Sequence, residues 1–450
     1  MSIISFIKAI LFLEYHDMSL AYRKIMIGEF DHRQISYFVV CSIFIVVANQ
    51  FTYSVSDFSD VILCNSILSI LSPLVPVFVI YFFYSSLVKT NRFDIPISYV
   101  LFFAISATSY VGLTETLDGS HAESKNYYIF GLSFYTATLA FHIMNRSLDR
   151  RYALLAANPL TLITGPVMCF FRWQTHKRFR TRVRYYFPFV LLGLFLHQAV
   201  ATPLTETFDL LEKTDAVSSI SFAIIFEFFV YSNFCGMSLM IFGLAGIFGM
   251  RVPLNFKQPF SSTNLIDFWK GWHLSLSMTL KTLFYLPIRQ RWGTYAAVAA
   301  VYMCSAFWHG VTFNFLLWGG VHAFAYMATL FLLRRKVPFL PLVILVVAML
   351  FGRLVYIDTI PERLVEKLAF DFDGWHALSY IASRGGAVMM SIGLITLFIA
   401  SEFLLRRTRY FRQRMYKFYR LPVVQVALLV ITLMSLSANI GIDYAVYGQR

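Results

Sequence analysis

The sequence predicts an all-α polytopic membrane protein, and its composition is the first reason. Apolar residues make up 58% of the 450 positions and charged residues only 14%, with a mean hydropathy of +0.64. A soluble domain carries about 25% charged residues. Phe alone occurs 47 times, more than a surface facing water tolerates. The chain is therefore expected to be surrounded by membrane lipids.

Long apolar stretches are the second reason. A helix that spans a bilayer needs about 20 mostly apolar residues. The stretches that meet this length lie near residues 36–52, 61–84, 95–113, 127–144, 185–201, 216–232, 294–310, 312–333, 338–356, 387–405 and 421–440. They predict about 11 transmembrane helices.

The distribution of Lys and Arg predicts the orientation. Most of the 38 basic residues fall in alternate connectors, with dense groups at 172–184 and 406–420, and such loops stay on the cytoplasmic side. The N-terminus is then cytoplasmic and the C-terminus extracytoplasmic, in a multi-pass protein of the cytoplasmic (inner) membrane. This distribution explains the net charge of +14 without a nucleic-acid partner, which needs a basic face on a folded domain.

Three further apolar segments, near 153–171, 233–250 and 272–288, do not fit as simple crossings. Prolines interrupt the first, and the second contains four glycines, residues that disturb helices. Irregular backbone at membrane depth survives only where protein buries it or it lines a water-filled cavity. These segments therefore predict re-entrant pieces around a cavity open to the cytoplasm.

Polar residues inside apolar stretches are the candidates for chemistry, since intramembrane polar groups are functional by default. Trp308-His309-Gly310 closes the predicted span 294–310, and an imidazole there could transfer protons near neutral pH. The alternative is a buried histidine that hydrogen-bonds a neighbouring carbonyl. The five cysteines show no paired spacing, so neither a disulfide framework nor a metal site is indicated.

Other polar residues in apolar surroundings have structural interpretations. The stretch 267–277 is typical of an interfacial helix with Trp269 and Trp272 at the headgroup level. His322 is expected to pack in the core, and Glu227 to pair with a neighbouring polar group. The basic groups are interpreted first as topology determinants.

Two histidine motifs resemble those of the membrane-bound O-acyltransferase family, in the bacterial branch that acetylates alginate or D-alanylates teichoic acids. They are DFWKGWHLSLS at 267–277 and FWHGVTFNFLLWGGVHAF at 307–324. The resemblance covers roughly residues 130–370. Further stretches that resemble the branch in order are GLSFYTATLAF (131–141), NPLTLITGP (158–166), NFCGMSLMIFG (233–243), VPLNFKQPF (252–260) and FGRLVYIDTIPERLVEKL (351–368).

The resemblance implies a fold and a reaction. Members have a thinned centre, in which a cytoplasmic and an outer funnel meet at the catalytic histidine, here His309; His273 is the second family histidine. An acyl group passes from a cytoplasmic thioester donor, acyl-CoA or an acyl carrier protein, to an acceptor at the outer face. An extracytoplasmic esterase-like partner can complete delivery to a glycan. No permanently bound cofactor and no metal is expected; supporting side chains are Asn314, Ser277, His322 and Trp308.

The sequence divides into a less family-like membrane region at 1–126, a catalytic core at 127–370 and C-terminal transmembrane helices at 371–450. Within the core, Lys281-Thr282 stand where the family usually has Arg-Asp, and Asn233 where an aspartate is common. These departures bear on the donor and on partner docking.

The resulting hypothesis is a membrane O-acyltransferase that moves an acetyl- or D-alanyl-type group to a hydroxyl of a cell-surface glycan or of a protein that delivers it. Three alternatives stay open. The acceptor could be a lipid or a protein; the histidines could form the proton relay of a transporter or flippase; or the chain could be a catalytically idle scaffold.

Overall fold

The computed structural model describes one helical bundle. It covers residues 178–438 apart from 310–311, 359, 373–376 and 408–416, together with 137–138, 140–141, 166–167, 169 and 172–173. The predicted spans 36–52, 61–84 and 95–113, nearly all of 127–144 and most of segment 153–171 lie outside these residues. Within them, the predicted all-α class is confirmed, except that β1 (Arg172–Trp173) and β2 (Met250–Arg251) pair antiparallel as a two-stranded ribbon.

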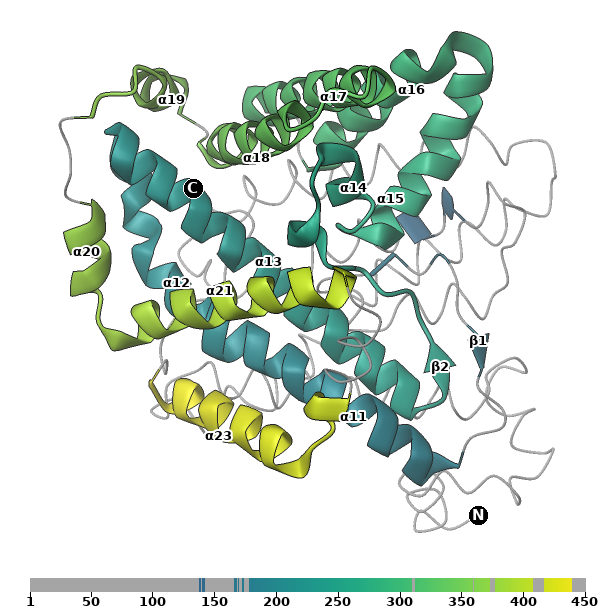
Figure 1. Ribbon diagram of the computed structural model, residues 1–450, viewed down its shortest axis with the longest axis vertical. Helices are drawn as coiled ribbons and strands as arrows, with labels where there is room; N and C mark the ends of the chain where they lie inside the picture. Colours follow the sequence, from purple (N-terminus) through teal and green to yellow (C-terminus); the bar gives the residue numbers. More distant parts are fainter. Residues whose placement is uncertain are drawn as a thin grey trace, which may run out of the picture.

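The helices follow one another with short connections (Figure 1). In chain order they are α11 (Phe179–Phe195), the π-helix η4 (Leu196–Ala201), α12 (Thr202–Leu204), the 3-10 helix η5 (Thr205–Glu212), α13 (Ala216–Ile247), the 3-10 helix η6 (Pro259–Ser261), α14 (Leu265–Trp269), α15 (Leu274–Leu280), the π-helix η7 (Lys281–Tyr285), α16 (Leu286–His309), α17 (Phe313–Arg334), α18 (Leu340–Ile357), α19 (Pro361–Leu368), α20 (Ala377–Ser383), α21 (Gly386–Arg407) and α23 (Pro422–Ala438).

Five of these helical runs are long and apolar enough to cross a membrane, by length and composition. They are Phe179–Glu212, Ala216–Ile247, Phe313–Arg334, Leu340–Ile357 and Gly386–Arg406. The predicted spans 312–333, 338–356, 387–405 and 421–440 coincide with α17, α18, α21 and α23. The predicted span 294–310 begins directly after a kink in α16 at Gly293, whose φ of 83° a glycine adopts without strain.

The division of the chain at residue 232 is wrong. A span at 216–232 followed by a re-entrant segment at 233–250 was predicted, but α13 is one helix of 32 residues, capped by the Asp215 side chain. Its glycines serve close packing. A Cβ on Gly236 would lie 2.7 Å from the Gly193 carbonyl oxygen, and one on Gly246 within 2.2 Å of the Tyr186 ring. Small residues let membrane helices approach in this way, so α11 and α13 lie side by side (Figure 1).

The C-terminal helices are attached to η4 by serine hydroxyls. Ser391 of α21 donates to the Ala199 carbonyl over 3.0 Å, and Ser435 of α23 donates to the Gln198 carbonyl over 2.8 Å. A π-helical turn disturbs the regular ladder of backbone hydrogen bonds, and polar groups at membrane depth must find partners within the protein. These two bonds therefore fix α21 and α23 against the bundle.

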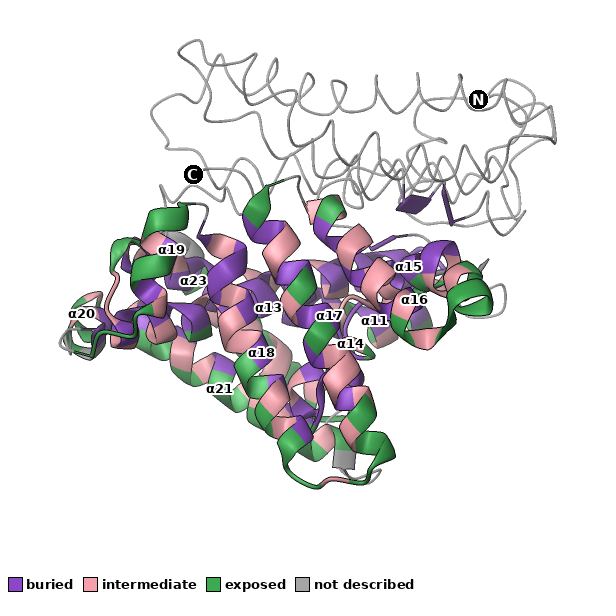
Figure 2. Ribbon diagram, turned by 90° about the horizontal axis from the view of Figure 1, so that it is seen from above, coloured by how far each residue is buried: buried purple, intermediate pink, exposed green. Residues whose placement is uncertain are grey.

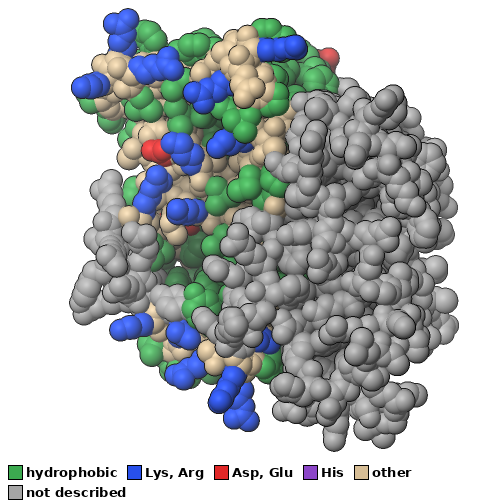
Figure 3. Space-filling model, turned by 90° about the vertical axis from the view of Figure 1, so that its right-hand side faces the viewer, with side chains coloured by type: hydrophobic (Ala, Val, Ile, Leu, Met, Phe, Trp, Pro, Cys, Tyr) green, Lys and Arg blue, Asp and Glu red, His purple; other side chains and the backbone are tan. Residues whose placement is uncertain are grey.

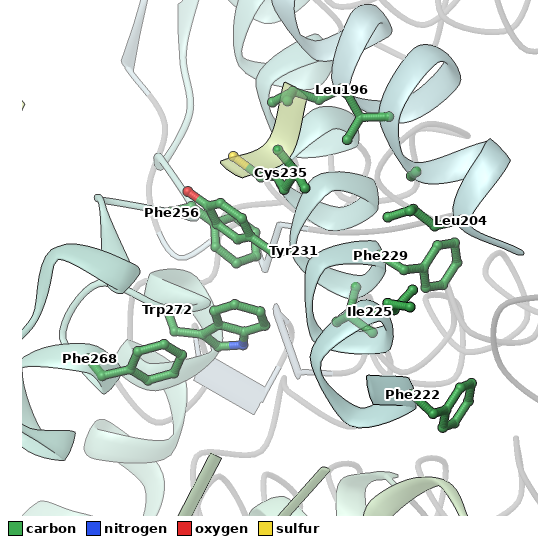
Figure 4. Packing of buried hydrophobic residues seen from close by; sticks show 14 of the residues in the cluster. Leu196, Leu204, Phe222, Ile225, Phe229, Tyr231, Cys235, Phe256, Phe268 and Trp272 are labelled. Atoms are coloured by element: carbon green, nitrogen blue, oxygen red, sulfur yellow. The ribbon is translucent and has the colours of Figure 1, made fainter. Parts of the chain in front are cut away.

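Burial follows the position of each helix in the bundle (Figure 2). Most of α13 is buried, whereas α18, α21 and α23 expose large apolar side chains such as Val347, Leu397 and Met434. Apolar residues on the outside of a membrane bundle face lipid. A core cluster of the described residues joins α13 to the 256–272 region through Tyr231, Phe256 and Trp272 (Figure 4).

Candidate active site

His309 ends α16 among aromatic rings from α17 and α18. Its ring centroid lies 5.0 Å from that of Trp308, 5.4 Å from Trp318, 6.1 Å from Phe315 and 5.3 Å from Tyr356. The imidazole stays partly exposed. The sequence brings these rings together because α16 and α17 form a hairpin, and α18 returns alongside α17 (Figure 1). The arrangement holds a basic nitrogen in apolar surroundings.

Tyr356 and Asn314 connect α17 and α18 at this point. The Tyr356 hydroxyl lies 3.1 Å from His309 Nδ1, and the Tyr356 backbone carbonyl accepts from Asn314 Nδ2 over 2.9 Å. The Thr312 hydroxyl donates to Asn314 Oδ1. Asn314 therefore contacts the backbone of the residue that holds His309, and it belongs to the support of the site.

A charged pair lies beside Tyr356. Arg353 Nε donates to Glu227 Oε2 of α13 over 2.7 Å, and both side chains are at most 10% exposed. The Arg353 guanidinium carbon lies 5.3 Å from the centre of the Tyr356 ring. The prediction that Glu227 pairs with a polar neighbour is confirmed. Buried charges require such pairing.

His273 stands at the start of α15 in a left-handed backbone conformation, with φ 45° and ψ 54°. Residues other than glycine rarely adopt it, and such strain clusters at functional sites. Its ring centroid lies 6.1 Å from that of Trp308, which in turn contacts His309. The two histidines therefore contact the same indole.

Asn255 holds the His273 segment in place. Its Oδ1 accepts from the Ser275 hydroxyl over 2.7 Å and from the Ser275 backbone N–H over 3.2 Å, while its Nδ2 donates to Ser238 of α13 over 3.3 Å. Its backbone carbonyl accepts from Leu274 N over 2.8 Å. One fully buried amide thus ties the residues after His273 to the long central helix.

Ser277 and His322 lie apart from His309. The Ser277 hydroxyl donates to the Trp272 carbonyl over 3.3 Å, so it supports the turn around His273. His322 is buried, with Nδ1 3.1 Å from the Trp318 carbonyl oxygen. Its ring packs against Trp269 at 5.5 Å. The packing interpretation of His322 is the one that these contacts favour.

The indoles of Trp269 and Trp272, predicted at the headgroup level, pack against protein rings, and their depth in the membrane stays a prediction. Trp272 is buried and stacks on Phe268 at 5.4 Å between ring centroids, and Trp269 packs edge-to-face on Tyr302 at 5.9 Å. Both indoles face protein rings, because the segment folds back onto α13 and α17 rather than lying along a surface.

The charged groups near the ends of this region are paired. Burial alone would raise the pKa of Asp267, but hydrogen bonds from Asn264 and Lys270 hold it below its ordinary value. On the face shown in Figure 3, Lys and Arg far outnumber Asp and Glu. Among the residues described by the structure, no three His, Cys, Asp or Glu side chains gather as a metal site would require.

Three residues of the site were not singled out from the sequence: Arg353, Tyr356 and Asn255. Arg353 had a signal, since a charged residue inside an 18-residue apolar helix is unusual. Tyr356 and Asn255 had none, because their partners lie 47 and 20 residues away at no regular spacing.

The fold and the site together define a helical protein with helices of membrane-spanning length, in which two histidines contact one tryptophan. The chain belongs to the MBOAT, or membrane-bound O-acyltransferase, family: the profile of this family matches residues 84–339, more than half of the sequence.

Individual relatives in the comparison share less than a third of their aligned residues with this chain. The chain is 27% identical over 206 residues to the peptidoglycan O-acetyltransferase of Helicobacter pylori, a match that covers 41% of this chain and 38% of that protein. It is 28% identical over 213 residues to the probable alginate O-acetylase AlgI of Pseudomonas aeruginosa, covering 43% and 41%. It is 28% identical over 109 residues to the teichoic acid D-alanyltransferase of Bacillus subtilis, covering 22% and 28%. Each match thus spans less than half of the relative's length.

Proposed function

We propose that this protein is a membrane O-acyltransferase that transfers an acyl group from a thioester to a hydroxyl at the outer face. The observation that carries the proposal is His309, partly exposed at the end of α16 within an aromatic enclosure, in a chain of this family. The names of the relatives favour a polymer of the cell envelope as the acceptor.

In the proposed reaction, His309 is the general base. Its free ring nitrogen takes the proton of the acceptor hydroxyl, and the oxygen attacks the thioester carbonyl. The tetrahedral intermediate collapses with loss of the thiolate, which takes the proton back from the imidazolium. The products are an ester and a free thiol. His273, across Trp308, would position the donor or polarise its carbonyl.

The wider architecture belongs to the same proposal. About 11 transmembrane helices would surround two funnels that meet near His309, with the N-terminus cytoplasmic, the C-terminus extracytoplasmic and the whole in the bacterial inner membrane. The donor, acyl-CoA or an acyl carrier protein, would enter from the cytoplasm. An extracytoplasmic esterase-like protein would receive the acyl group or deliver it to the glycan.

Acyl transfer at matched membrane expression tests the proposal. Wild type, His309→Ala and His197→Gln are compared in cells or proteoliposomes, with mass spectrometry of the envelope glycan and of co-purifying protein. General-base assistance is worth about 10²–10⁴ in rate, so His309→Ala is expected to lose at least that factor. His197, which hydrogen-bonds Asn233 between η4 and α13, is the control for a half-buried histidine outside the site.

Three outcomes would redirect the proposal. Full acylation by His309→Ala would remove the general-base assignment, and substrate uptake into proteoliposomes without any acyl donor would favour a transporter. An acyl mark on lipid or protein rather than glycan would keep the reaction and change the acceptor.

A further inference from the structure

The hydroxyl of Tyr356 lies within hydrogen-bond distance of one ring nitrogen of His309. Tyr356 Oη and His309 Nδ1 are 3.1 Å apart. The tyrosine is only 8% exposed. Its ring is enclosed by Phe315, with centroids 4.9 Å apart, and by Trp318 at 5.8 Å. The hydroxyl therefore has a fixed place beside the imidazole.

Two further contacts fix Tyr356, one from α17 and one from an earlier turn of its own helix α18. Asn314 of α17 donates to its backbone carbonyl, and Arg353 of α18 lies over its ring. Arg353 is itself bound to Glu227 of α13. Through Tyr356, the position of His309 on α16 is thus linked to helices α17, α18 and α13.

We propose that Tyr356 is a positioning residue that selects the reactive tautomer of His309, an inference that rests on the proposed acyl transfer. In a neutral imidazole one nitrogen carries the proton and the other is the base, and the hydrogen bond at one nitrogen decides which is which. In this proposal Nδ1–H is the donor and the Tyr356 oxygen the acceptor of the 3.1 Å contact, which leaves the lone pair on Nε2 for the acceptor hydroxyl. Without that oxygen, the proton can reside on either nitrogen.

The ion pair between Glu227 and Arg353 adds no net charge beside Tyr356 and His309. His309 gains a positive charge when it takes the acceptor proton, and Arg353 lies within electrostatic range of it. A lone guanidinium would oppose that charge. Because Glu227 neutralises Arg353, the cation can hold the Tyr356 ring without disfavouring the imidazolium.

Tyr356→Phe tests the inference, since it removes the hydroxyl and keeps the ring. We expect kcat for acyl transfer to fall about tenfold, the worth of one hydrogen bond, with KM unchanged. The pH dependence of kcat should also change, whereas a purely structural loss would lower kcat equally at every pH. Tyr186→Phe, at a buried tyrosine between α11 and α13, is the matched control and should behave as wild type.

The outcomes separate this inference from the proposed function. If His309→Ala abolishes transfer and Tyr356→Phe matches wild type in kcat and pH profile, the positioning role is overturned and the acyltransferase proposal stands. If instead His309→Ala retains full transfer, both the positioning role and the acyltransferase mechanism are overturned. Tyr356→Ala serves as the second variant: a role in packing alone predicts that Phe restores what Ala loses.

Discussion

Two buried carboxyl groups connect α13 to α18 and to α21, and they have partners of different kinds. Glu227 of α13 pairs with the cation of Arg353 on α18, beside Tyr356 and His309. Glu402 of α21 accepts from the hydroxyl of Tyr231 on α13. Glu227 and Tyr231 are four residues apart, so they lie on the same face of α13, one turn from each other.

The difference lies in what each partner can do. A tyrosine hydroxyl both donates and accepts a hydrogen bond, whereas a guanidinium only donates. The hydrogen bond at Glu402 could therefore be made by a neutral side chain. It lies among the rings of Phe260 and Trp272, which enclose Tyr231. The region next to His309 keeps a full ion pair at membrane depth. Burying an ion pair is rarely favourable on balance, so its presence near His309 points to a role other than stability.

The largest effect is expected from Glu227→Gln, which leaves Arg353 buried without its counter-charge. Breaking a buried ion pair from one side costs about 3–5 kcal/mol. The melting temperature of the purified protein in detergent should fall by several degrees. A melting temperature equal to that of wild type would contradict the claim that Glu227 and Arg353 form a buried ion pair.

The double variant Glu227→Gln, Arg353→Met sharpens this test. Replacing both partners by neutral groups is often nearly neutral for stability, so the double variant should recover most of the lost melting temperature. It should not recover acyl transfer fully, since the Tyr356 ring has then lost the group that lies over it. Recovery of both properties would reduce the ion pair to a structural feature.

The next effect concerns Asp358, the cap of α18, which is an ionic carboxyl outside the spans. Its side chain is buried, 2.6 Å from Lys367 Nζ and 2.9 Å from the Arg363 guanidinium. Burial, the largest single influence, would raise the pKa of Asp358, but the hydrogen bonds from Arg363 and Lys367 outweigh it and lower this pKa.

The sign of the pH dependence follows. A carboxyl whose pKa is lowered in the folded state contributes stability that is fully present above its unfolded pKa of about 3.9, and that is lost as pH falls through the folded value. The contribution of Asp358 to the melting temperature should therefore be constant above about pH 5 and fall below about pH 4. Asp358→Asn should be less stable at neutral pH and lose part of this acid dependence. An identical acid profile in both proteins would contradict the assignment.

Helix positions were largely predictable from the sequence where they depend on an apolar stretch long enough to cross the lipid bilayer. The helices α17, α18, α21 and α23 follow directly from apolar stretches of membrane length. The end of α13 was not predictable in this way, because its glycines were taken as interruptions. Glycine disturbs an isolated helix through its backbone freedom, but a neighbouring helix compensates. Gly236 and Gly246 lie against α11 with no room for a Cβ, and a single sequence does not show which partner helix will be there.

The candidate site divides in the same manner. His309, Trp308 and His273 were found from local motifs, and the structure brings them together around one indole. Tyr356 reaches His309 from a helix 47 residues later. Hydrogen bonds of that range depend on how α16, α17 and α18 cross, and no residue spacing encodes them.

The smallest effect is expected from Glu402→Gln, which tests the neutral side of the comparison. The Tyr231 hydroxyl donates to Glu402 Oε1. A glutamine carbonyl in the same place can accept from that hydroxyl. The number of hydrogen bonds is thereby kept, and the cost should stay below about 1 kcal/mol. A melting temperature within one or two degrees of wild type, measured beside Glu227→Gln in the same detergent, would support the distinction. An equal loss in both variants would mean that Glu402 is charged and paired with a cation, and that the two regions are alike.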